Sequence, residues 1–134
     1  MGPAKVVVRY VDGNVLKGFT QDFLPNKDHF HLHPFDQSVG RKPVKIMVKD
    51  LKAVFFVKDF EGDAAYRERR TFSEADKIQG RKIEVVFQDG EQLVGSTMGY
   101  DRSRQGFFIV PVDSGGNNER VYVVQAAVNR VGFI

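Results

Sequence analysis

The chain has 134 residues, of which 42% are hydrophobic and 12% aromatic, and its net charge is +3. This apolar content suffices for a folded core and excludes a disordered chain, while the absence of cysteine excludes disulfides, thiolate zinc sites and cysteine nucleophiles. The first ten residues, MGPAKVVVRY, hold a run of only three valines, too short for a signal peptide or a membrane span. We therefore expect a cytoplasmic protein.

Positive charge is concentrated at the beginning of the chain. Residues 1–58 carry ten Lys and Arg against five Asp and Glu, while residues 59–81 and 82–134 each carry five against six. The three segments thus contribute +5, −1 and −1 to the total of +3. A basic first segment attracts phosphates or acidic partners, but it does not indicate a fold.

Residues 5–23, KVVVRYVDGNVLKGFTQDF, predict a β-hairpin. Alternate side chains from Val6 to Tyr10 are apolar, and the Asp12-Gly13 pair then marks a tight turn. Residues 16–24 form the expected second strand, in which the interior Gly18 marks a bulge or a sharp bend. Three more short strands are expected at 29–35, 43–49 and 52–58.

The strand at 29–35 places His29, His31 and His33 on one face. Alternate histidines can chelate a divalent metal, although such a site needs a further ligand and a second shell of partners. A bare match at this spacing is a weak motif. We therefore favour a solvated or partner-facing polar face over a metal site, and we expect no cofactor.

Basic side chains follow the strand at 43–49 and recur in the segment 59–81. They are candidates for binding a polyanion through phosphate contacts, which would be independent of sequence. Two other interpretations are lysines that protect an edge strand from aggregation and a solvated connector. An arginine cluster beside a small barrel resembles PilZ domains, which bind cyclic di-GMP, but here the Asp-x-Ser-x-Gly run precedes the arginines and is one residue short. The candidates are Arg41, Lys42, Lys45, Lys49 and Lys52, and in the second segment Arg67, Arg69 and Arg70.

Residues 82–100 repeat the first hairpin as KIEVVFQDGEQLVGSTMGY. With an offset of 77 the two parts of the chain align without a gap and share 13 identities over 53 pairs, among them Gly13/Gly90, Gly18/Gly95 and Pro34/Pro111. The second copy accordingly predicts strands at 106–112, 120–126 and 129–134. We interpret the chain as an internal duplication of 1–58 and 82–134, joined by a charged linker at 59–81.

The stretch GEQLVGSTMGYD resembles the first signature of Sm-like barrels through Gly90, Gly95, Tyr100 and Asp101. The whole chain is similar to an uncharacterised bacterial family of paired Sm-like domains. The resemblance implies an all-β fold of two tandem five-stranded small barrels and no established activity. Sm-like proteins typically read RNA with an asparagine at the position of Gln105 and with an Arg-Gly turn that is absent here. Specific RNA recognition is therefore not expected.

The two copies differ on the outward faces of their third and fourth strands. Copy one is mostly polar there, whereas copy two is almost entirely apolar, and a strand that is apolar on both faces is normally covered on both. We expect an interface, with the other barrel, the linker or a second chain as the cover and self-association as the favoured form with another chain. The interface candidates are Phe108, Val110, Tyr122 and Val124.

No nucleophile–base pair, phosphate-binding glycine loop or paired carboxylates stand out, so we expect no enzymatic activity. The sequence favours a non-catalytic binding, adaptor or regulatory module of the bacterial cytosol that contacts protein partners. The alternative is weak, sequence-independent binding of nucleic acid or a cyclic dinucleotide by the basic first barrel and the linker arginines. No membrane association is expected.

Overall fold

The computed structural model describes residues 3–36, 42–61, 72, 78, 80–113 and 115–134. The first half contains β1 (Ala4–Tyr10), β2 (Val15–Thr20), β3 (His29–Pro34), β4 (Val44–Met47) and β5 (Leu51–Val57). The second half contains β6 (Arg81–Phe87), β7 (Gln92–Thr97), β8 (Gly106–Pro111), β9 (Asn118–Val124) and β10 (Val128–Phe133). Short 3₁₀ turns, η2 (Val48–Asp50) and η3 (Gln125–Ala127), precede β5 and β10. The predicted all-β class is confirmed.

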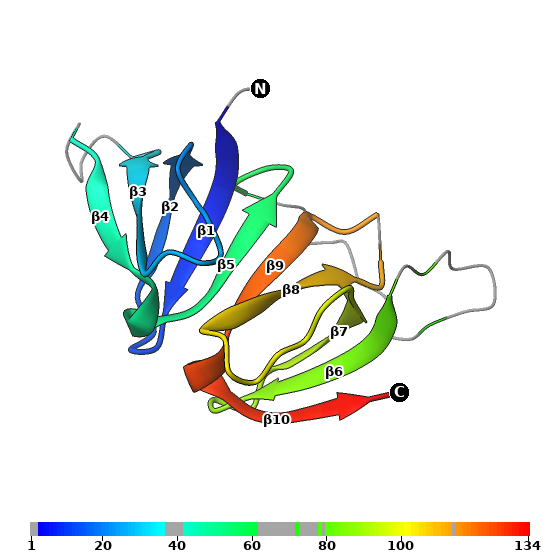
Figure 1. The fold of residues 1–134 in the computed structure, drawn as a ribbon. Helices are drawn as coiled ribbons and strands as arrows, with labels where there is room; N and C mark the ends of the chain where they lie inside the picture. The colour runs from blue at the N-terminus through cyan, green and yellow to red at the C-terminus, as the bar shows by residue number, and fades with distance from the viewer. Residues whose placement is uncertain (1–2, 37–41, 62–71, 73–77, 79, 114) are drawn as a thin grey trace.

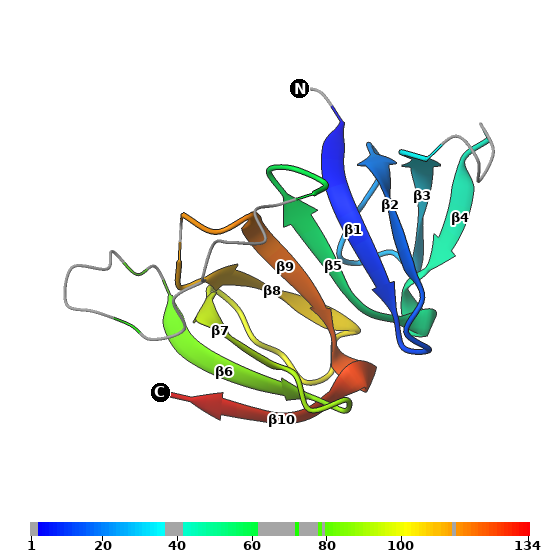
Figure 2. The same cartoon turned by 180° about the vertical axis from the view of Figure 1, so that it is seen from behind.

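The strands form one open, antiparallel, ten-stranded sheet in the order β10-β6-β7-β8-β9-β5-β1-β2-β3-β4 (Figures 1 and 2). The prediction of two separate five-stranded barrels is therefore wrong. Strand β5 pairs with β1 on one side and with β9, from the other half of the chain, on its other side. The halves are thus joined edge to edge through β5 and β9.

The sequence of β5 explains why the first half does not close by itself. All seven residues of LKAVFFV are buried. Because side chains alternate along a strand, Ala53 and Phe55 join the core of the second half, while Val54 and Phe56 join the core of the first half. A strand that is apolar on both faces requires cover on both, and pairing with the second half supplies the second cover.

Strand β9 contributes to both cores in the same way. Val121 and Val123 belong to the core of the second half, whereas Tyr122 and Val124 reach into the core of the first half. The pairs Val54↔Tyr122 and Phe55↔Val121 set the register of the junction. Each half therefore completes its core with side chains from the other.

Corresponding elements of the two halves begin at positions 77 apart: β1 and β6, β2 and β7, β3 and β8, η2 and η3, β5 and β10. The two Asp-Gly turns have matching geometry, with φ of +95° at Gly13 and +90° at Gly90. A side chain at Gly18 or Gly95 would collide with a backbone carbonyl of β3 or β8. No helix among the described residues is long and apolar enough to cross a membrane.

Candidate functional site

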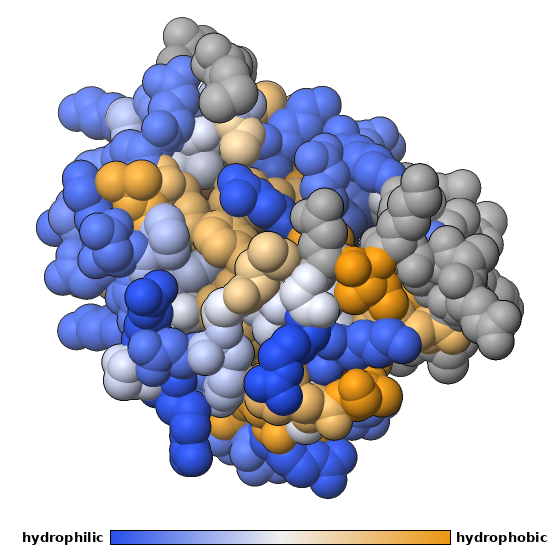
Figure 3. Space-filling view, turned by 45° about the vertical axis from the view of Figure 1, so that its right-hand side comes forward, coloured by the Kyte–Doolittle hydropathy of each residue, from blue (hydrophilic) through white to orange (hydrophobic). Residues whose placement is uncertain are grey.

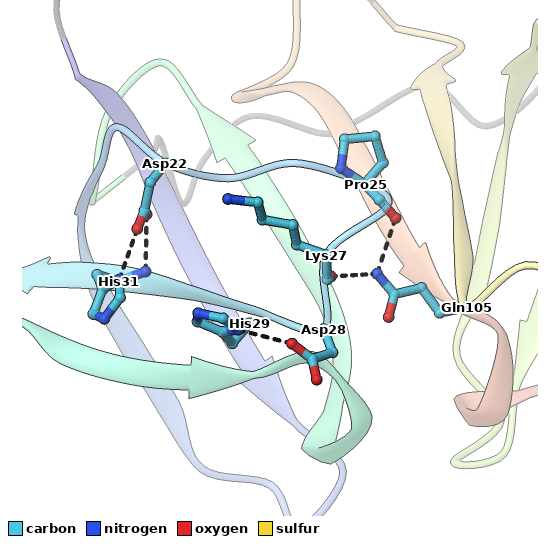
Figure 4. Close-up of polar contacts among 7 residues, drawn as sticks. All are labelled: Asp22, Pro25, Lys27, Asp28, His29, His31 and Gln105. Atoms are coloured by element: carbon cyan, nitrogen blue, oxygen red, sulfur yellow. Dashed lines mark hydrogen bonds and ion pairs between the residues drawn. The ribbon is translucent and has the colours of Figure 1, made fainter.

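Polar contacts fix the β2–β3 loop of the first half against the second half. Tyr122 Oη donates a hydrogen bond to the carbonyl oxygen of Pro25 at 3.0 Å. Gln105 Nε2 donates to the carbonyl oxygens of Pro25, at 2.9 Å, and Lys27, at 2.5 Å (Figure 4). Burial raises the pKa of Tyr122, although its hydrogen bond with Gln105 and the charge of Arg104 oppose the shift.

An aromatic cluster lies beneath these bonds. The ring centroid of Phe23 lies 5.0 Å from that of Tyr122, 5.5 Å from that of Phe56 and 6.1 Å from that of Phe108, each pair in an edge-to-face arrangement. This geometry matches the electrostatic preference of aromatic pairs. The guanidinium of Arg120 covers the rings of Phe56 and Phe108 at 4.2 and 4.7 Å. Both halves of the chain supply the cluster, so it holds them together.

Lys52 forms a second connection between the halves. Its side chain is only 11% exposed, and Nζ lies 2.7 Å from Asp89 Oδ2 and 2.7 Å from Glu91 Oε1 in the second half. The hydrogen bond from Lys52 is the largest cause of the lowered pKa of Asp89. The ammonium also lies 4.7 Å from the centroid of the Phe87 ring. Lys52 therefore forms ion pairs within the junction. The prediction that grouped it with the surface cations of the fourth strand is wrong.

A cleft of about 1130 Å³ opens beside the junction, between the β2–β3 loop and strands β7 and β8. Two apolar side chains in its wall are largely in solvent, since Met98 is 77% and Val110 is 53% exposed. Figure 3 shows such apolar side chains at the surface, bordered by hydrophilic ones. The described lining residues are Pro25, Asn26, Ile78, Ser96, Thr97, Met98, Gly99, Arg104, Gln105, Gly106, Phe107, Phe108, Val110 and Tyr122.

Alternate residues of β8 direct their backbone N–H and C=O groups toward this cleft. The N–H of Gln125 bonds to the carbonyl of Gln105, in register with the pairs Gly106↔Val124 and Phe108↔Tyr122. Since hydrogen-bonded and non-bonded pairs alternate in an antiparallel ladder, Gly106 and Phe108 direct their backbone groups away from β9, toward β7. Beyond the pair Ser96↔Val110, β7 and β8 separate, and Thr97 Oγ1 donates to the carbonyl of Phe108 at 2.9 Å.

The first half closes the equivalent gap with a carboxylate. Asp22 Oδ1 accepts the backbone N–H of His31 at 2.9 Å, and Asp22 Oδ2 lies 2.7 Å from His31 Nδ1 (Figure 4). Burial opposes ionisation of Asp22, but these bonds outweigh it and lower the pKa. At the offset of 77, His31 corresponds to Phe108 and Asp22 corresponds to Gly99. The second half therefore has glycine where the first half has this carboxylate.

A further difference between the halves explains how the cleft reaches the junction. Tyr122 replaces Lys45 at the offset of 77, and Gly106 replaces His29. A Cβ atom at residue 106 would lie 2.5 Å from the carbonyl oxygen of Val123 and 2.6 Å from the ring of Tyr122, far closer than such atoms pack. The backbone of β9 and the Tyr122 ring thus both require glycine on β8, and Gly106, Tyr122 and Pro25 all line the cleft.

The sequence matches the model of a family of unknown function, DUF6982, over residues 2–134. The chain belongs to this family. No curated protein and no solved structure matches it. Membership in DUF6982 therefore assigns no ligand, and function must be argued from the site.

The structure places the interface candidates of this DUF6982 chain in two environments. Tyr122 and Val124 are buried at the junction, and the half-buried Phe108 packs against the same core. The first half covers these three side chains. The sequence had left three covers open, namely the other half of the chain, the linker or a second chain, and the structure shows the first of them for these residues. Val110 lies in the open cleft instead.

The three histidines lie along β3, and two of them have carboxylate partners. His29 Nδ1 lies 2.7 Å from Asp28 Oδ1, and this hydrogen bond is the largest cause of the lowered pKa of Asp28. His31 bonds to Asp22, while His33 is exposed. Among the described residues, no group of three or more His, Cys, Asp or Glu side chains is placed to hold a metal ion.

The structure describes only some of the basic candidates. Lys42, Lys45 and Lys49 are exposed on and beside β4, an edge of the sheet. The other candidates, Arg41, Arg67, Arg69 and Arg70, lie outside the described residues.

Sequence reasoning missed most of the cleft, including Met98, Gly99 and Arg104. The available signal was the set of positions at which the two aligned copies disagree. Asp22/Gly99, His29/Gly106 and Lys45/Tyr122 all fall at or beside the cleft. Reading such differences together, instead of only the identities, points to this region of the DUF6982 chain.

Proposed function

We propose that the chain is a non-catalytic binding module that takes an extended peptide segment of a partner protein in the cleft between its halves. The observation that carries the proposal is the cleft itself, in which Met98 and Val110 are 77% and 53% exposed. Exposed apolar surface of this kind marks interaction sites. The volume of about 1130 Å³ lies near the upper limit of the range of roughly 300–1,000 Å³ of ligand pockets and suits several residues of a peptide.

The wider role that we propose is that of an adaptor or regulatory module in a bacterial cytosol. The absence of cysteine supports a reducing compartment. The matching positions of corresponding elements in the two halves support an origin by duplication, after which one copy acquired the cleft. The buried junction residues support a function in which both halves act as one body.

Selection of displayed peptides against the purified protein tests the proposal. We expect enriched peptides to bind the wild type and to lose binding on Val110→Glu, which places a charge in the cleft. The matched control is His33→Glu, the same substitution at the corresponding exposed position of the first half, and it should leave binding unchanged. Peptides that bind both variants as well as the wild type would place the binding surface elsewhere and overturn the proposal.

A second candidate function is weak binding of polyanions at the edge of the sheet. The exposed lysines on and beside β4, Lys42, Lys45 and Lys49, support it. Asp28 and Asp50 are exposed in the same region and reduce the net positive field. Contacts of this kind neutralise phosphates without reading bases, so the affinity would be sensitive to salt.

A further inference from the structure

We propose that the cleft recognises an acidic side chain next to an apolar one in an extended peptide, with the carboxylate accepting the backbone N–H of Phe108. This inference rests on the proposed function and specifies its ligand. The chain carries its own example of the interaction, because the first half places the carboxylate of Asp22 on the equivalent N–H of His31.

The geometry of the first half shows what the site accepts. The bond from His31 N to Asp22 Oδ1 is 2.9 Å long, and Thr20 Oγ1 donates to the same oxygen at 3.3 Å. A carboxylate is suited to this place because it offers several lone pairs to donors that converge on it, and charge-assisted bonds of this kind are the stronger class. The equivalent donors of the second half are the N–H of Phe108 and the hydroxyl of Thr97.

Of these two donors, the hydroxyl of Thr97 bonds to the carbonyl of Phe108 at 2.9 Å. At the offset of 77, the N–H of Phe108 corresponds to that of His31, and Gly99 takes the place of Asp22, whose carboxylate accepts the N–H of His31. A Cβ atom built on Gly99 meets no atom of the described residues within 4 Å. Among these residues, the second half thus keeps the donor and leaves space for an acceptor from outside the chain.

The charge of the cleft favours an anion. Arg104 is the charged side chain among the described lining residues. Its Nε lies 3.7 Å from Asp101 Oδ2, and its side chain is 78% exposed. Among the described residues this is the ion pair of Arg104, and it involves Nε alone, so that the other guanidinium donors can meet a bound carboxylate, which arginine binds in bidentate geometry. The N–H of Phe108 and Arg104 therefore both select a negative group.

The backbone of β8 favours a peptide over a simple aliphatic acid. Gly106 and Phe108 both direct backbone groups toward the gap between β7 and β8, and such an edge is the ordinary site for addition of a strand. Side chains of an added strand alternate, so an apolar residue next to the acidic one reaches the wall formed by Met98 and Val110. An aliphatic acid has no backbone groups with which to pair along this edge.

The binding of short synthetic peptides, followed by ¹H–¹⁵N NMR, tests the inference. The probe is an N-acetylated, C-amidated peptide of about five residues with one aspartate between valine and leucine, and its control has asparagine instead of aspartate. We expect the aspartate peptide to shift the amide signal of Phe108 but not that of His31, and to bind about tenfold more tightly than the asparagine peptide, as loss of a charge-assisted bond predicts. Decanoate is the third probe, and we expect it to bind more weakly than the aspartate peptide.

Gly99→Asp is the decisive variant, because it supplies from within the chain the carboxylate that the first half already has. The open space at Gly99 allows it to fold, and we expect the aspartate peptide to lose at least about tenfold in affinity. Gly132→Asp, which adds the same charge at a glycine with open surroundings, should leave binding unchanged.

Two outcomes would overturn the inference and leave the proposed function standing. In the first, both peptides bind equally and Val110→Glu abolishes both; in the second, Gly99→Asp binds the aspartate peptide as tightly as the wild type does. Tighter binding of decanoate than of any peptide would overturn the choice of a peptide. If neither peptide shifts signals of the cleft, both the inference and the proposed function fail.

Discussion

Replacement of Tyr122 by alanine should weaken the whole protein, although the residue belongs to the second half of the sequence. Its side chain is fully buried, packs edge-on against Phe23 at 5.0 Å and Phe108 at 5.1 Å, and donates a hydrogen bond to the Pro25 carbonyl. Truncation of a buried aromatic residue to alanine costs about 3–5 kcal/mol. Since domains of this size are stable by roughly 5–15 kcal/mol, Tyr122→Ala should remove a large part of the free energy of unfolding.

The lost hydroxyl adds little to this cost. The carbonyl of Pro25 keeps the bond from Gln105, so it does not become unsatisfied, and Tyr122→Phe should cost only about 0.5–1.5 kcal/mol. The matched control is Lys45→Ala at the equivalent position of the first half. Lys45 is exposed, and its replacement should change stability by no more than about 0.5 kcal/mol.

Urea unfolding followed by circular dichroism and by tyrosine fluorescence measures these changes. Because the two cores share β5 and β9, both probes should report one transition with the same midpoint. The reasoning would be refuted if Tyr122→Ala cost less than about 1 kcal/mol, or if it shifted one of two separate transitions and left the other in place. Either result would mean that the halves do not share their cores.

Three other results are expected. Gly106→Ala should be strongly destabilising, because its Cβ would lie 2.5 Å from the carbonyl oxygen of Val123 and 2.6 Å from the Tyr122 ring. The double variant with Tyr122→Ala removes the contact with the ring and should cost less than the sum of the two; strict additivity would speak against this contact. The pKa of Asp89 is lowered from its ordinary value of 3.8, so its contribution to stability is present above about pH 4 and is lost as the pH falls through the lowered pKa. Lys52→Met should therefore flatten the loss of stability in urea titrations below about pH 4, and an unchanged pH profile would contradict the pairing. Any affinity for nucleic acid should be weak, independent of sequence and abolished by moderate salt in filter binding, and tight binding of one RNA at raised salt would contradict it.

Local patterns in the sequence were sufficient to predict the strands, but they did not predict how the two halves of the chain pack together. The period of two in VVVRY and IEVVF and the Asp-Gly turns depend only on neighbouring residues, which is why the hairpins were predicted at the correct place. The apolar second face of copy two was also visible in the sequence. The sequence did not show which residues cover this face, because the covering residues, such as Phe23 and Phe56, are distant in the chain.

The sequence by itself determined the all-β class, the approximate positions of the strands and the offset of 77 between corresponding elements, since these follow from hydrophobic period and turn chemistry. Tertiary structure decided that β5 pairs with β9 instead of closing a barrel, because a strand buried on both faces is stable only when both are covered. It also decided the candidate site. Asp22 and His31 are nine residues apart in the sequence, and nothing local shows that one caps the backbone of the other. Only with that contact known does Gly99 indicate a candidate site, because glycine stands there in place of the carboxylate of the first half.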